Sequence, residues 1–114
     1  MARILDIFLD KKTNRNCEKY PDHGSLFAGL GHEEADAIHC LSARVSGSIY
    51  NIGKSYRLSD DNIEELICDC ITICLQKIKT GKYTFQGHNP ATYVIEIAKN
   101  RAKNLRRSAL RHET

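Results

Sequence analysis

The feature that most constrains the fold of this chain is the spacing of its apolar residues. In three segments, residues 33–56, 63–78 and 91–109, apolar side chains recur every three or four positions, which is the period of a helix with one buried face. No segment shows the alternating pattern of a strand that is buried on one side. The sequence therefore predicts an all-α fold, a small bundle of three main helices with one or two short N-terminal helices.

Residues at the expected helix ends agree with this assignment. Ser59 is placed to cap the second main helix, and Gly81 is placed to end it. Asn89 and Pro90 are of the types preferred at the cap and the first position of a helix, so the third main helix is expected to begin there.

At 114 residues the chain is long enough for one small domain with a single core. Residues 1–24 are expected to form an N-terminal segment, with a short helix at its start, and a polar linker. Residues 25–114 are expected to form the helical domain. Within it, Ser25 is placed to cap a short helical turn that contains Phe27 and ends at Gly31.

The last helix carries positive charge beside its apolar stripe, although the formal net charge of the chain is only +3. A cationic row at four-residue steps consists of Lys99, Lys103, Arg107 and Arg111. Beside it, Asn100 and Asn104 offer amides that hydrogen-bond base edges, so the face combines groups for phosphates and for bases. The alternative is a solvated face whose cations complement the helix dipole. Six cations against one acid between Glu96 and His112 favour a nucleic acid partner.

The loop before this helix, residues 82–88, adds aromatic rings. We expect Tyr83 and His88 to be exposed and to stack on the bases of a single strand. For Phe85 and for Tyr93, which follows the loop, we expect instead that the rings cap the core, because buried aromatic side chains are the commoner kind.

Acidic residues gather near the start of the second main helix. They are Asp60, Asp61, Glu64, Glu65 and Asp69. Acids at this position complement the positive end of the helix, and capping alone accounts for them. Their alternative role, docking on a partner protein, depends on a family resemblance.

Several classes of function lack the residues they need. The five cysteines are an odd number, and we expect reduced thiols in a cytoplasmic protein. The spacing Cys68-x-Cys70-x-x-x-Cys74 differs from the Cys-x-x-Cys hairpin of structural zinc, so no metal is expected. No apolar run approaches membrane-spanning length. Without a nucleophile paired to a histidine or a phosphate-binding loop, neither an enzyme nor a cofactor is expected.

Two motifs stand in order along the chain. The first is Glu64-Glu65-Leu66-Ile67-Cys68-Asp69, and the second is Tyr93-Val94, two further residues, and Ile97-Ala98-Lys99-Asn100, followed by Arg106-Arg107. With them, residues 25–111 resemble region two of a bacterial RNA polymerase sigma factor of the extracytoplasmic-function type. The family usually has Gln at the place of Cys68, Trp-Leu at the place of Tyr93-Val94, and Asp at the place of Asn104.

The resemblance implies a non-enzymatic domain that starts transcription. Core RNA polymerase would be bound by Glu64, Glu65, Cys68 and Asp69. The melted promoter DNA would be bound by Lys99, Asn100, Lys103, Asn104, Arg106, Arg107, Tyr83 and His88. An anti-sigma factor is a further partner that the family implies.

Other interpretations stay open. The family's region four is not found in this chain, so we expect either a piece of a longer factor or a domain that acts alone. The main alternative function is a protein-interaction bundle, such as a sigma-like decoy or adaptor, without productive DNA binding. A small metalloprotein built on the cysteines is a third.

Overall fold

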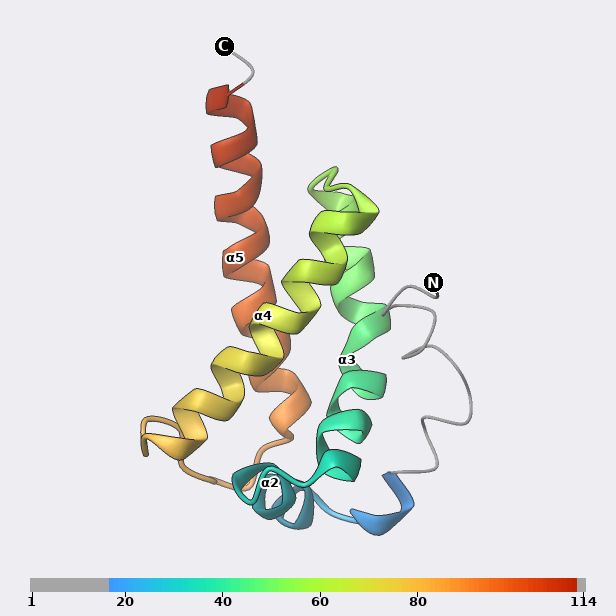
Figure 1. Cartoon of the computed structure of the whole chain (residues 1–114), viewed down its shortest axis with the longest axis vertical. Coiled ribbons are helices and arrows are strands. Elements are labelled where there is room, and N and C mark those ends of the chain that lie inside the picture. Colours follow the sequence, from blue (N-terminus) through green and yellow to red (C-terminus); the bar gives the residue numbers. More distant parts are fainter. Residues whose placement is uncertain (1–16, 113–114) are drawn as a thin grey trace.

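The computed structural model describes residues 17–112, which form a 3-10 turn at residues 17–19 and four α-helices. The helices are α2 (His23–Gly31), α3 (Ala35–Ser55), α4 (Asp60–Lys79) and α5 (Pro90–His112). The three long helices run side by side in alternating directions, and α2 lies across the end of the bundle where α4 finishes and α5 begins (Figure 1). These described residues contain no strand. The predicted all-α bundle with a short helix before three long ones is confirmed.

Both predicted ends of α4 and the predicted start of α5 are confirmed. The side chain of Ser59 accepts a hydrogen bond from the backbone N–H of Asn62 at 3.2 Å, which caps α4. The side-chain oxygen of Asn89 accepts from the N–H of Ala91 at 3.0 Å, at the start of α5. Gly81 follows the last turn of α4 with a φ of 76°, a conformation that glycine adopts without strain.

The residues from 17 to 24, predicted to end a polar linker, are instead folded against the bundle. Tyr20 is only 6% exposed, and its hydroxyl donates a hydrogen bond to the Glu34 carboxylate at 2.8 Å. The cap of α2 is Asp22, which accepts from the N–H of Ser25 at 2.7 Å, so Ser25 lies inside the helix that it was predicted to cap. In the sequence, Tyr20 stands among polar residues, so the segment shows no apolar pattern that would predict its packing. Residues 1–16, with the predicted N-terminal helix, lie outside the described part.

The core lies between α3, α4 and α5 and is closed at one end by α2. Its fully buried side chains include Leu26, Leu30, Leu41, Val45, Ile49, Ile63, Leu66, Ile67 and Val94. The two helices α3 and α4 approach closely at Gly53, where an added Cβ would lie 2.4 Å from Cγ1 of Ile63. On α5 the buried stripe continues with the small residues Ala98 and Ala102, which let this helix lie close to its neighbours.

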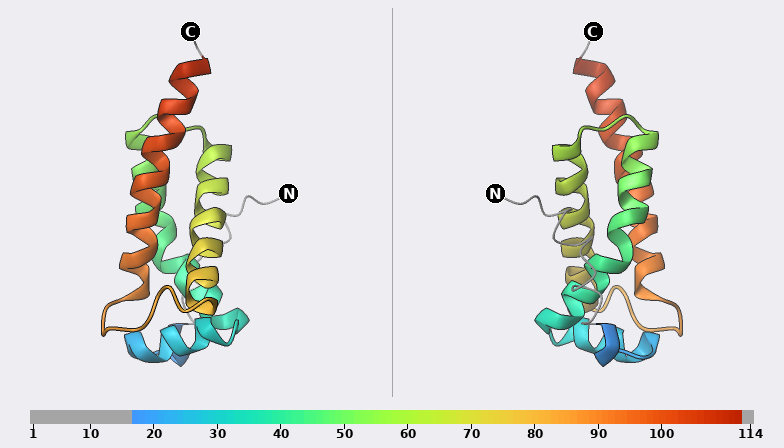
Figure 2. Two further views of the ribbon diagram at one scale, coloured as in Figure 1. Left: turned by 90° about the vertical axis from the view of Figure 1, so that its left-hand side faces the viewer. Right: turned by 90° about the vertical axis from the view of Figure 1, so that its right-hand side faces the viewer.

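The last turns of α5 extend past the ends of α3 and α4 (Figures 1 and 2). Leu105, predicted to belong to the buried stripe, is 38% exposed, so that prediction is wrong. The helical period does continue to this residue, but the neighbouring helices do not cover it. Lys103, Asn104 and Arg107, on the same stretch of α5, are exposed as well.

Candidate nucleic-acid interface

One side of α5 presents the predicted cations and amides to solvent. The exposed members are Lys99, Asn100, Lys103, Asn104 and Arg107, and Arg106 is half-buried. Because Lys99, Lys103 and Arg107 are each one helical turn apart, their charges form a continuous row. Arg111, the last member of the predicted row, lies beyond the residues whose side chains are described.

One ion pair changes the charge of this surface. Nζ of Lys99 lies 3.1 Å from Oε1 of Glu96, so part of its charge is balanced on α5 itself. In contrast, Lys103, Arg106 and Arg107 form no ion pair with any described residue. The positive charge that is free to meet phosphates is therefore concentrated in the C-terminal half of the helix.

A cavity of about 370 Å³ lies beside the first turns of α5, between this helix and the preceding loop. Its lining consists of Lys82, Tyr83, Thr84, Gln86, His88, Asn89, Thr92, Tyr93 and Glu96. The volume falls within the range of pockets that hold small molecules, about 300 to 1,000 Å³. His88 is exposed, as predicted.

Two tyrosine rings form one wall of this cavity. The ring of Tyr83 stacks on that of Tyr93, with centroids 4.0 Å apart and planes 19° apart. Tyr83 was predicted to be exposed and is half-buried, because Tyr93 occupies one of its faces and Phe27 of α2 contacts it edge-on at 5.1 Å. Burial raises the pKa of Tyr83 to about 12, so its phenol stays neutral. Phe85, predicted to cap the core, is 40% exposed.

The cavity and the cationic row lie on the same face of α5. The positions that share this face are Thr92, Glu96, Lys99, Asn100, Lys103 and Arg107. They recur at the three- and four-residue steps that place side chains above one another on a helix. Thr92 and Glu96 were missed from the sequence, although counting back from Lys99 in helical steps reaches both. Lys82 and Gln86 also line the cavity and were also missed. Their positions depend on the path of the loop, which residue spacing does not reveal.

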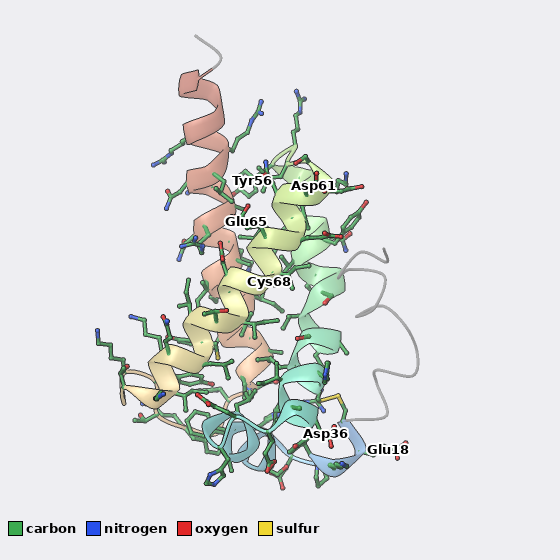
Figure 3. The ribbon with its side chains drawn as sticks, viewed as in Figure 1. Glu18, Asp36, Tyr56, Asp61, Glu65 and Cys68 are labelled. Carbon is green, nitrogen blue, oxygen red and sulfur yellow. A yellow bond between two sulfur atoms is a disulfide. The ribbon has the colours of Figure 1, made fainter. Side chains whose placement is uncertain are left out.

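The four residues expected to bind polymerase lie along α4. Glu65 is exposed, while Glu64, Cys68 and Asp69 are half-buried. Figure 3 labels Glu65 and Cys68 on successive turns of this helix. Partial burial, followed by the charges of Asp69 and Glu64, raises the pKa of the Cys68 thiol, which therefore remains protonated and unreactive at neutral pH.

Asp69 has a partner within the chain that the sequence did not reveal. Nη2 of Arg101 on α5 lies 3.3 Å from Oδ2 of Asp69, and both side chains are more than 40% exposed. This contact joins the helix expected to bind polymerase to the helix expected to bind DNA. An exposed pair of this kind contributes at most about 1 kcal/mol, so it orients the two side chains more than it stabilises the fold.

The cysteines differ from the prediction of five reduced thiols. Cys17 and Cys40 form a disulfide, with Cα atoms 4.9 Å apart, so the prediction is wrong for these two. The two cysteines meet because the N-terminal turn folds against α3. No local sequence pattern predicts that contact. Cys68, Cys70 and Cys74 are free thiols. Within the described residues, no three side chains of the metal-binding types come together.

No family model, curated protein or solved structure matches this chain. Among the described helices, none is long and apolar enough to cross a membrane. The function must therefore be inferred from the surfaces of the molecule itself.

Proposed function

We propose that this chain is a transcription initiation domain of the kind found in region two of a sigma factor. In this proposal α5 and the cavity bind a single strand of melted promoter DNA, and α4 binds core RNA polymerase. The observation that carries the proposal is the continuity of the cavity with the cationic row on one face of α5. A cytoplasmic location and an anti-sigma partner belong to the same proposal.

The cationic row and the cavity suit different parts of a single strand. A single strand offers phosphates along its backbone and flat bases that have left the stack, and proteins bind it with cations and aromatic rings. Here the row from Lys99 to Arg107 is suited to phosphates. The cavity, with the rings of Tyr83, Tyr93 and His88 and the side chains of Gln86 and Thr92, is suited to one base. Helical geometry places Thr92 and Arg107 about 22 Å apart, enough for several nucleotides.

The polymerase half of the proposal rests on α4. Its first turns present carboxylates at a partly exposed surface, and charges at the rim of an interface speed association and fix its register. The two binding surfaces lie on helices that pack against each other in one core, and the Arg101–Asp69 pair joins their exposed sides.

A series of labelled single strands, each with one base removed at a different position, tests whether the cavity holds a base. With core polymerase present, removal at one or two positions should weaken binding by about 1 to 3 kcal/mol, the usual contribution of a stacked base. Thr92→Trp fills the cavity and should abolish this dependence on position. The matched control, Asn51→Trp at an exposed position of α3, should retain it.

The interaction-bundle alternative is favoured by one observation, the stacking of Tyr83 on Tyr93, which removes one of the faces expected to meet a base. If no base position affects binding in the wild-type protein, while core polymerase is still bound, this alternative replaces the DNA-binding proposal.

A further inference from the structure

We propose that the Cys17–Cys40 disulfide is a redox-controlled clamp on the cavity. Reduction by a small thiol of the glutathione class, or by a dithiol protein, would loosen α2 and the loop of residues 82–88, and so lower the affinity for a single strand. The effect on DNA rests on the proposed function, whereas the effect on α2 and the loop does not.

The disulfide fixes the position of α2. It joins the turn before α2 to the buried Cys40 of α3 and spans 23 residues of sequence, so the whole of α2 lies inside the closed loop. Tyr20 lies in the same loop and presses against α2, since a Cβ added at Gly29 would lie 2.6 Å from Cε1 of this ring. Opening the bond returns conformational freedom to this segment.

Aromatic contacts connect α2 to the wall of the cavity. The Phe27 ring lies 5.1 Å from the Tyr83 ring and 5.5 Å from the Phe85 ring, centroid to centroid. A Cβ added at Gly24 would lie 3.4 Å from Cε2 of Phe85, so the backbone of α2 also borders this loop. Tyr83 in turn is one wall of the cavity. A displacement of α2 therefore removes the support of that wall.

The two sulfur atoms differ in access. Cys17 is half-buried, whereas Cys40 is 0% exposed. The incoming thiolate therefore attacks Sγ of Cys17, the bond between the two sulfurs breaks, and Cys40 leaves as a thiolate that takes up a proton. A second thiol then attacks the mixed disulfide and releases Cys17 as a thiol. The chain gains two electrons and two protons, and the reductant becomes a disulfide.

The remaining thiols do not compete in this exchange. Burial raises the pKa of Cys70 to about 11 and that of Cys74 to about 12, so neither forms the reactive thiolate at neutral pH. In a reducing compartment, such as the proposed cytoplasmic location, a disulfide is usually transient and often serves as a sensor, and the half-buried Cys17 gives a reductant access to this one.

Hydrogen exchange of the full chain, oxidised and then reduced with dithiothreitol, tests the clamp. Reduction should speed exchange of the amides in α2 and in residues 82–88 by about tenfold or more, while the centre of α4 stays unchanged. In parallel, the affinity for a labelled single strand, measured with core polymerase, should fall about tenfold. Cys17→Ala should match the reduced protein in both measurements and not respond to dithiothreitol. Cys70→Ala, at a free cysteine outside the clamp and outside both proposed binding surfaces, should respond to dithiothreitol like the wild type.

Exchange that stays within twofold in both segments on reduction of the wild-type protein would overturn the clamp, whether or not the Cys17→Ala variant folds. Faster exchange with unchanged DNA affinity would overturn its control of the cavity. If the oxidised protein binds no single strand at all, the proposed function fails. The hydrogen exchange of α2 and of residues 82–88 then tests the clamp by itself.

Discussion

At the scale of single residues, Asn100 and Lys103 share one face of α5 but offer different chemistry. Both are exposed. The lysine ammonium meets any phosphate in the same way, whatever the base attached to it. The asparagine amide both donates and accepts hydrogen bonds, so it distinguishes one base edge from another.

Asn100→Ala should therefore reduce discrimination among DNA sequences and leave the salt dependence of binding nearly intact. The expected loss is about 1 to 3 kcal/mol between a preferred and a changed strand. Fluorescence anisotropy of two labelled strands over a salt series measures both quantities, and Asn51→Ala on α3 is the control. A changed salt slope with unchanged discrimination would show that this residue acts on the backbone instead.

Glu65 is the cleanest test of the polymerase surface, because it is exposed and forms no ion pair with the described residues, whereas Asp69 is held by Arg101. Glu65→Lys should weaken binding to core polymerase without a change in melting temperature, since it reverses a charge at the interface rim. Glu18→Lys, at the opposite end of the molecule in Figure 3, should leave the affinity as it is. If Glu65→Lys binds core polymerase as tightly as Glu18→Lys does, the acids of α4 only complement the positive end of that helix.

At the scale of the elements, the crossing of α3 and α4 depends on a missing side chain. Gly53→Ala should destabilise the fold by about 1 to 3 kcal/mol, because the new methyl group would collide with Ile63 and force the helices apart. Gly47→Ala is the matched control on the same helix, since a Cβ there meets nothing within 4 Å. It should be neutral or stabilise by up to about 1 kcal/mol. Denaturant unfolding compares the two, and equal midpoints would contradict the close crossing.

Helix positions were predictable from the sequence where their causes are local. The caps at Ser59 and Asn89 depend on residues within three positions of them, and both were found. The need for glycine at position 53 was not predicted, because the reason for its presence lies in Ile63 on another helix. Leu105 was misplaced because periodicity does not reveal where the neighbouring helices end.

At the scale of the whole molecule, one part of the candidate site could be predicted from the sequence and another could not. The cationic row follows from helical spacing and was predicted, but its continuity with a cavity depends on the path of the loop from Lys82 to His88. The disulfide was missed because its two cysteines meet only after the N-terminal turn has folded onto α3. Since α4 and α5 run in opposite directions, the acidic start of one lies at the same end of the bundle as the basic end of the other (Figure 1).

The most direct test of the central claim, that this face of α5 binds a single strand, is the salt dependence of binding by a Lys103→Ala/Arg107→Ala variant with core polymerase present. Both cations are exposed and unpaired among the described residues. Their removal should weaken binding at least about tenfold and lower the slope of log affinity against log salt by about 1.4, since each phosphate contact on a single strand contributes about 0.7. Arg44→Ala/Lys54→Ala, which removes the same charge from α3, should leave both unchanged. An affinity and slope equal to those of the wild type would contradict DNA binding by α5.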